Sequence, residues 1–161
     1  NAMRRIADTP ALQQQLRGNP GLIPSFLEEV LRLEGSTKAT FRLARRKTRI
    51  GEFEVPAGKR VVVALAAANR DPRRWDEPQE FRFDRPRIRE HLAFGRGVHT
   101  CIGAPLARAE VRVILEHFLR HTSAISLSEE KHGKPGNRRL DYEPSFIIRG
   151  LANLHVELAG K

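Results

Sequence analysis

The chain has 161 residues and carries 29 lysines and arginines against 19 aspartates and glutamates, a formal net charge of +10. This length suits one domain or one piece of a larger domain, and a hydrophobic content of 40% excludes general disorder. The single cysteine excludes an internal disulfide, and the sequence shows no membrane-length apolar run and no signal peptide. We therefore expect a soluble cytoplasmic protein without membrane contact, whose positive charge favours an acidic or polyanionic partner.

The first part of the sequence predicts helices. Residues 1–2 precede Met3 and are interpreted as the scar of a cleaved expression tag. Residues 3–15 have the pattern of the end of a helix, which a break rich in glycine and proline then stops. From Ile23 onward, apolar residues recur at three- and four-residue spacing, which predicts an amphipathic helix over residues 24–33.

The middle of the sequence predicts a hairpin and a second helix. Residues 51–55 and 59–65 have the composition of strands and are separated by a Pro-Ala-Gly turn, so we expect them to pair with each other. Residues 69–78 contain two prolines and predict turns and a short helix. Residues 105–120 begin with proline and carry an apolar stripe, which predicts the second strong helix.

The last part of the sequence is poorer in regular patterns. Residues 128–139 are charged and contain proline and glycine, which predicts an exposed loop. Residues 146–148 and 153–158 predict two strands joined across Gly150. The predicted fold class is therefore α+β, mainly α.

The strongest chemical signal surrounds Cys101. Gly95, Gly97 and Gly103 lie close to it in the sequence and allow the backbone to approach a flat group. Cys101 also precedes a predicted helix N-terminus, a position that suits a thiolate, and thiolate sulfur is a strong ligand for iron. The alternative is that Cys101 is a small buried hydrophobic residue, as most lone intracellular cysteines are.

The order of residues in this loop favours the ligand. The haem-binding loop of the cytochrome P450 family is similar to a run of positions in this chain: Phe94, Gly95, Gly97, His99, Cys101 and Gly103. The resemblance implies that the Cys101 thiolate is the axial ligand of the iron of haem b, with the other loop residues around the cofactor. It also implies the carboxy-terminal, proximal part of the cytochrome P450 fold, with short β-hairpins.

The same resemblance implies a structural cluster. Glu29 and Arg32 match the family's E-x-x-R pair, and their spacing puts both side chains on one helical face. The family's third partner is an arginine from a later connection, which here would be Arg85, with Arg82 as a poorer candidate. The alternative for Glu29 and Arg32 is an ordinary surface ion pair.

Two further residues are expected at the haem propionates. Arg42 stands where bacterial members of the family place a propionate-binding arginine, and His99 lies two residues before the cysteine. A charge-assisted hydrogen bond to a partly buried carboxylate suits both side chains. The alternative for Arg42 is a solvated basic segment, and we expect His117 and His121 to be surface histidines rather than metal ligands.

Members of the family are much longer than this chain. The resemblance implies that residues 3–161 are the carboxy-terminal haem-binding portion, without the long distal helix that binds dioxygen. The complete enzyme would be a monooxygenase that uses O₂ and two electrons, supplied by a ferredoxin- or flavodoxin-type donor, to hydroxylate a small organic substrate.

The isolated chain is expected to be inactive and able to form a homodimer through an exposed apolar distal surface. One alternative is a haem-free remnant with a structural or regulatory role. Another, less favoured, is a basic nucleic-acid-binding module. It rests on the net charge alone, because aromatic residues make up only 6% of the chain, so we expect no nucleic-acid partner.

Overall fold

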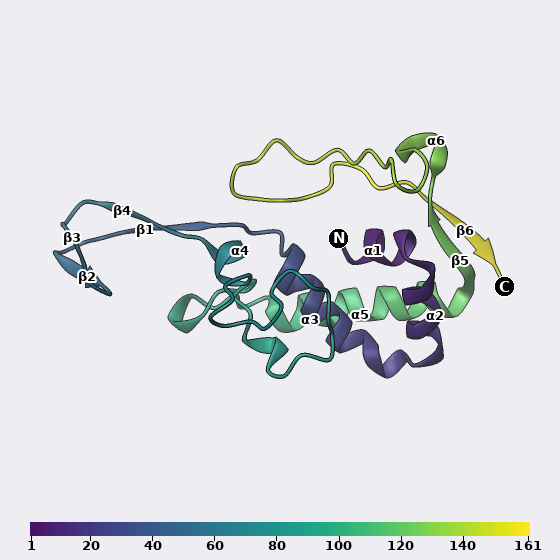
Figure 1. Cartoon of the computed structure of the whole chain (residues 1–161), viewed down its shortest axis with the longest axis horizontal. Helices are drawn as coiled ribbons and strands as arrows, with labels where there is room; N and C mark the ends of the chain where they lie inside the picture. Colours follow the sequence, from purple (N-terminus) through teal and green to yellow (C-terminus); the bar gives the residue numbers. More distant parts are fainter.

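A computed structural model describes all 161 residues, as a helical body from which a narrow β arm projects (Figure 1). The α-helices are α1 (Ala2–Asp8), α2 (Pro10–Gly18), α3 (Ile23–Glu34), α4 (Leu65–Ala68), α5 (Ala104–His121) and α6 (Glu129–His132). Short 3-10 turns lie at η1 (Pro20–Leu22), η2 (Ile88–Glu90) and η3 (Gly97–His99). The strands are β1 (Thr40–Leu43), β2 (Thr48–Ile50), β3 (Phe53–Val55), β4 (Arg60–Val63), β5 (Thr122–Leu127) and β6 (Val156–Gly160).

The hydrophobic core lies where α1, α2, α3, α5 and β5 meet. It is a single cluster of 12 buried residues, and α3 packs against α5 (Figure 1). Phe26 of α3 is fully buried and meets the rings of Phe81 and Phe83 edge-on, at centroid distances of 5.8 and 6.5 Å. This aromatic contact fixes α3 against the long connection that follows α4.

Both predicted long helices are confirmed, and each extends one residue further at either end than its sequence pattern indicates. Proline in the first turn of each helix needs no N–H donor there. α3 ends before Gly35, where the backbone turns to an extended ψ of 136°. Glycine fits here because a Cβ would lie 2.6 Å from the carbonyl oxygen of Leu31 and 3.2 Å from Cβ of Ala93. The segment before Cys101 can therefore pass close to the end of α3.

The prediction that residues 51–55 and 59–65 pair with each other is wrong. β3 pairs with β2 and β4 pairs with β1, both antiparallel, so that two successive strand pairs form the projecting arm (Figure 1). Arg42 and Arg49 lie within β1 and β2, and the strands are mostly exposed. The hydrophobic alternation that reveals a half-buried strand is therefore absent from both.

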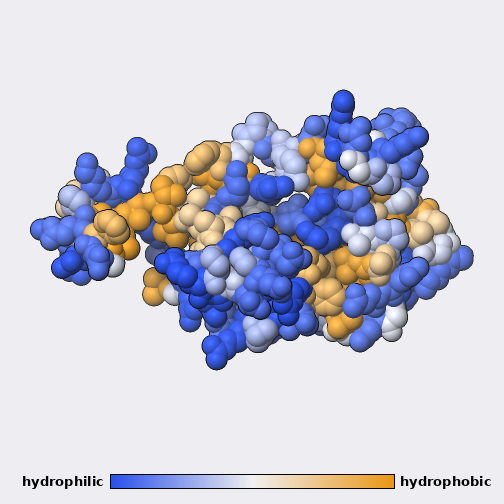
Figure 2. All heavy atoms as spheres, viewed as in Figure 1, coloured by the Kyte–Doolittle hydropathy of each residue, from blue (hydrophilic) through white to orange (hydrophobic).

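Apolar atoms gather along this arm (Figure 2). Leu43 in β1 and Val62 in β4 are exposed, as is Phe53 in β3. The arm therefore carries little of the packing that holds the body together.

Of the two strands predicted on either side of Gly150, only the second forms, as β6. β6 returns to the body and pairs antiparallel with β5, with Val156 opposite Leu127. Residues 146–148 contribute only an isolated bridge, from Ile148 to Thr37. Because β5 lies about thirty residues upstream of β6, the pairing leaves no local turn signal in the sequence.

Part of the predicted exposed loop, residues 128–139, is structured. The short helix α6 lies in it, and His132 at its end is buried. The His132 ring is held by backbone groups, because its Nε2 accepts the His155 N–H at 2.8 Å and its Nδ1 lies 3.1 Å from the Arg139 carbonyl oxygen. The ring thereby ties α6 to the segment that leads into β6.

The predicted class, mainly α with short β-hairpins, is confirmed. Residues 1–2 take part in the fold: α1 begins at Ala2, and the Asn1 side-chain amide donates a hydrogen bond to the Glu34 carbonyl oxygen at 2.6 Å. No helix combines the length and the apolar character needed to cross a membrane.

Candidate functional site

Cys101 lies in the loop between η2 and α5, and its thiol is exposed. Its backbone N–H donates to the Phe94 carbonyl oxygen at 2.9 Å, and its own carbonyl accepts the Ala104 N–H at 3.2 Å. Gly95 and Gly97 have φ angles of +70° and +80°, which a residue with a side chain adopts only with strain. The loop thus presents the sulfur at the surface, and the buried-hydrophobe alternative for Cys101 is wrong.

One pocket of about 360 Å³ brings most of the expected cofactor residues together. Arg42 from β1 lies in its wall with Phe94, Gly95, His99 and Cys101. Gly97 and Gly103 belong to the same loop but lie outside this wall; a Cβ on Gly103 would be 3.8 Å from the Cys101 sulfur. A soft sulfur ligand, an aromatic ring and two basic side chains therefore share one cavity.

The two basic side chains of the pocket are free to bind an anion. Arg42 is exposed and donates only to groups next to it in the chain, the Thr40 hydroxyl at 3.1 Å and the Phe41 carbonyl oxygen at 2.8 Å. His99 ends η3 and is also exposed. Neither side chain forms an ion pair with a carboxylate of the chain.

Glu29, Arg32 and Arg85 form a buried cluster. Arg32 binds the Glu29 carboxylate in a two-pronged pair, with both N–O distances at 2.7 Å, and Arg85 Nε lies 3.0 Å from Glu29 Oε1. The side chains of Glu29 and Arg32 have no exposed area, so the surface-pair alternative is wrong. Arg82 reaches Glu29 through its backbone N–H alone, at 2.9 Å, while its side chain pairs with Glu77 and Asp84.

A second buried carboxylate, Glu28, is not among the site residues predicted from the sequence. Its oxygens lie 2.9 Å from His91 Nε2 and 2.6 and 2.9 Å from the guanidinium nitrogens of Arg108. Burial alone would raise the pKa of Glu28, but the hydrogen bonds from His91 and Arg108 outweigh it and lower that pKa to about 2. The Glu-Glu doublet in a helix rich in apolar residues is the one signal that pointed to a second buried acid.

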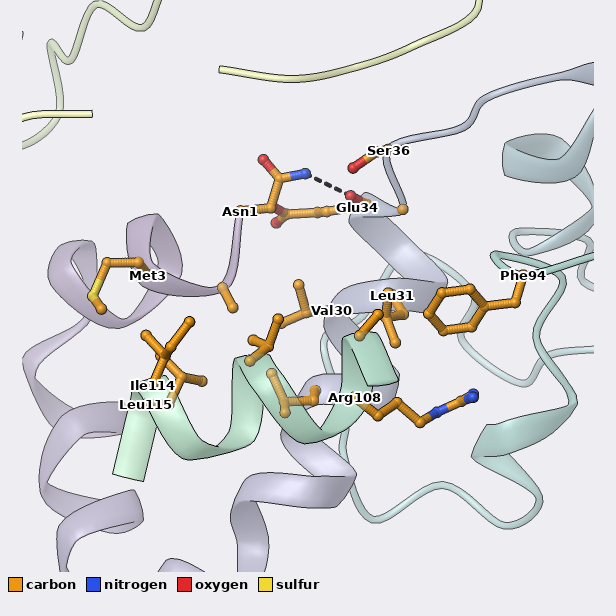
Figure 3. Close-up of a pocket in the computed structure, with 15 residues that line it drawn as sticks. Asn1, Met3, Val30, Leu31, Glu34, Ser36, Phe94, Arg108, Ile114 and Leu115 are labelled. Atoms are coloured by element: carbon orange, nitrogen blue, oxygen red, sulfur yellow. Dashed lines mark hydrogen bonds between the residues drawn. The ribbon is translucent and has the colours of Figure 1, made fainter. Parts of the chain in front are cut away.

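A larger cavity, of about 440 Å³, shares part of its wall with the Cys101 pocket. It is lined by side chains of α1, α3 and α5, among them Met3, Val30 and Ile114 (Figure 3). Phe94 and Leu31 belong to both cavities. The Phe94 ring therefore stands between the cysteine loop and the apolar surface of the helices.

Comparison with known proteins gives the family. The cytochrome P450 family model matches residues 3–139. The chain belongs to the cytochrome P450 family. Cytochrome P450 144 of Mycobacterium tuberculosis is 41% identical over 151 residues, which are 94% of this chain and 33% of the relative. The chain thus spans about a third of the length of this curated cytochrome P450.

Solved structures of the family have the same fold as this chain. The substrate-free Mycobacterium marinum cytochrome P450 CYP150A6 superposes with a TM-score of 0.96 at 50% identity, covering 99% of this chain and 39% of that one. An intact type IV self-sufficient cytochrome P450 monooxygenase gives a TM-score of 0.87 at 32% identity, over 98% of this chain and 20% of that one. The comparisons give no support to the homodimer, which stays a prediction.

Proposed function

We propose that residues 3–161 are the carboxy-terminal haem-binding portion of a cytochrome P450 monooxygenase. The observation that carries the proposal is the pocket wall shared by Cys101, Phe94, Arg42 and His99. The exposed thiol and the two uncompensated basic side chains suit a cofactor with a metal centre and carboxylate edges. The monooxygenase among the structural relatives supports the reaction class.

The residues of the pocket fit haem b by their chemistry. Cys101 would supply the axial thiolate, and Phe94 would shield one side of the sulfur from water. Arg42 and His99 would bind the propionates. Gly95 and Gly97 leave the cofactor side of the loop without Cβ atoms, and at Gly97 the space is open.

When bound, haem supplies the oxidising chemistry: one atom of O₂ enters a C–H bond of the substrate, and the other leaves as water after two electrons and two protons are added. The chain's own part is to hold a thiolate at the iron, where sulfur donation favours O–O cleavage. The Glu29–Arg32–Arg85 cluster holds the connection after α4 against α3, which keeps the haem-side core rigid.

The complete protein would draw electrons from a ferredoxin- or flavodoxin-type donor and act on a small organic molecule in the cytoplasm. Arg96 in the cysteine loop and Arg112 in the middle of α5 are both exposed, and an acidic donor could dock there. Dioxygen activation and most of the substrate pocket are assigned to sequence that the longer relatives have and this chain does not. The isolated chain should therefore bind haem weakly and show no productive turnover.

The proposal is tested by titrating the chain with haem and following the Soret absorbance. We expect Cys101→Ala to weaken haem binding at least about tenfold relative to the wild-type chain. His117→Ala is the matched control, since His117 is an exposed potential iron ligand on α5 outside the pocket. Equal affinities of the wild type and Cys101→Ala would contradict the proposal and favour the haem-free alternative, whereas a loss in His117→Ala would identify adventitious histidine ligation.

A further inference from the structure

A buried three-residue cluster links α3 to the cysteine loop. Glu28 is only 3% exposed and accepts hydrogen bonds from Arg108 of α5 and from the His91 ring, which begins the loop. His91 is itself 5% exposed. The Glu29 cluster described above forms no hydrogen bond or ion pair with His91 or Arg108, so the two acids of α3 bind different parts of the chain.

Both hydrogen-bond partners of Glu28, Arg108 and His91, contact Phe94 or its neighbour; the exposed Arg89 forms only a longer ion pair with Glu28, at 3.7 Å. The Arg108 guanidinium lies over the Phe94 ring, 4.6 Å from its centroid, and Figure 3 shows the two side chains next to each other. The His91 ring centroid is 6.3 Å from that of Phe94. His91 Nδ1 also accepts the backbone N–H of Ala93 at 3.1 Å. Phe94 is therefore held both through its ring and through the backbone before it.

Phe94 in turn is hydrogen-bonded to Cys101 through the backbone. The Phe94 carbonyl oxygen accepts the Cys101 N–H at 2.9 Å, and both residues line the same pocket. We infer that Glu28 is a positioning residue: by orienting Arg108 and His91 it fixes Phe94, and through Phe94 it fixes where Cys101 stands in the pocket. Only the consequence for haem rests on the proposed function, since the contacts belong to the chain alone.

The geometry explains why an acid is needed at Glu28. Arg108 presents two N–H groups to the carboxylate and its flat face to the Phe94 ring, and a bidentate pair restricts the guanidinium plane far more than a single contact does. A neutral amide in place of Glu28 keeps the size of the side chain but accepts only one of these donors well. Arg108, whose side chain is 29% exposed, would then be free to turn toward water.

Amide hydrogen exchange of the haem-free chain tests the inference. In Glu28→Gln we expect the Cys101 amide to exchange at least about tenfold faster than in the wild type. This factor corresponds to the loss of one charge-assisted hydrogen bond between Glu28 and Arg108. The core amides of Leu115 and Leu119 should accelerate much less. Equal acceleration of all these amides would show a purely structural role and overturn the inference, as would unchanged exchange at Cys101.

Glu34→Gln is the matched control. Glu34 is on the same helix, its side chain is 13% exposed, and it binds Arg4 at 2.7 Å and also Arg5. Its carboxylate forms no hydrogen bond or ion pair with His91 or Arg108. In this variant the exchange rate of the Cys101 amide should not rise more than the rates of the core amides of Leu115 and Leu119. A change at Cys101 equal to that of Glu28→Gln would overturn the inference.

Arg108→Lys keeps the test decisive if Glu28→Gln does not fold. Lysine retains the positive charge facing Glu28 but lacks the flat group that covers Phe94. We expect the same selective acceleration at Cys101, and wild-type exchange in this variant would exclude the link through Phe94.

A haem-bound readout separates this inference from the proposed function. In both variants the carbon-monoxide complex of the reduced, haem-loaded chain should contain less of the thiolate-type, red-shifted Soret band than the wild type and Glu34→Gln. A wild-type chain that never shows this band would refute the proposed function, while hydrogen exchange would still decide whether Glu28 positions Cys101.

Discussion

Glu28 and Glu29 are neighbours in α3, yet their carboxylates bind different parts of the chain. Glu29 Oε1 lies 3.0 Å from Arg85 in the connection after α4, whereas Glu28 Oε1 lies 2.6 Å from Arg108 in the helix that follows the cysteine loop. Successive residues of a helix point in directions about 100° apart, so two adjacent residues of α3 can contact two different segments of the chain. α3 thus contacts both the connection after α4 and the helix that follows the cysteine loop.

Removing the charge of Glu29 should destabilise the chain strongly. In Glu29→Gln two buried guanidinium groups, those of Arg32 and Arg85, lose their counter-charge, which costs about 3–5 kcal/mol in comparable buried pairs. Urea denaturation followed by circular dichroism measures the change in the free energy of unfolding. Glu54→Gln is the control, because Glu54 pairs with Lys47 on the exposed arm and should change stability by less than about 0.5 kcal/mol. Similar losses of unfolding free energy in the two variants would show that the buried cluster stabilises the chain no more than an exposed ion pair does.

The low pKa of Glu28 predicts a loss of stability in acid. Its carboxyl has a pKa of about 2 in the folded chain against an ordinary value of 4.5, so the folded state favours the charged form. The stabilisation is complete above the ordinary pKa and is lost as the pH falls from about 5 toward 2. Unfolding free energies measured between these limits should fall less steeply in Glu28→Gln than in the wild type. The pKa of Glu34 is also lowered, so the unfolding free energy of the variant still falls somewhat with decreasing pH. Parallel pH profiles for both proteins would refute the assigned role of the Glu28 carboxylate.

A methyl group at Gly35 should disturb the junction between α3 and the cysteine loop. The added Cβ would lie 2.6 Å from a backbone oxygen and 3.2 Å from the Ala93 side chain, and overpacking of this kind costs about 1–3 kcal/mol. Gly18→Ala is the matched control, since no atom lies within 4 Å of a Cβ built there and alanine favours the helical conformation. Thermal unfolding should show a lower Tm for Gly35→Ala and an unchanged or higher Tm for Gly18→Ala. The reverse order would contradict the close approach at Gly35.

Local patterns account for what the sequence predicts correctly. The apolar spacing in α3 and α5 is repeated over several turns, and the motif around Cys101 is contiguous, so both are visible in a single stretch of chain. The contact of Arg85 with Glu29 was expected only because a family resemblance supplied a partner 56 residues away.

Long-range contacts without a local pattern were not predictable in the same way. Glu28 meets His91 and Arg108 across 63 and 80 residues, and nothing in the sequence links these three positions. The strand pairings failed for the same reason: β5 and β6 are distant in the chain, and β1 and β2 are exposed and interrupted by arginines. The sequence thus identifies the cysteine loop, whereas the contacts of Glu28 with His91 and Arg108 emerge only from the tertiary structure.

Ligation of the haem iron by Cys101 can be read from one spectrum, that of the reduced chain with carbon monoxide bound. The chain is saturated with excess haem, reduced and exposed to carbon monoxide, beside Cys101→Ala treated identically. We expect a red-shifted Soret band of the thiolate type in the wild-type chain and no such band in Cys101→Ala. A wild-type spectrum without that band, or a variant that retains it, would exclude Cys101 as the iron ligand.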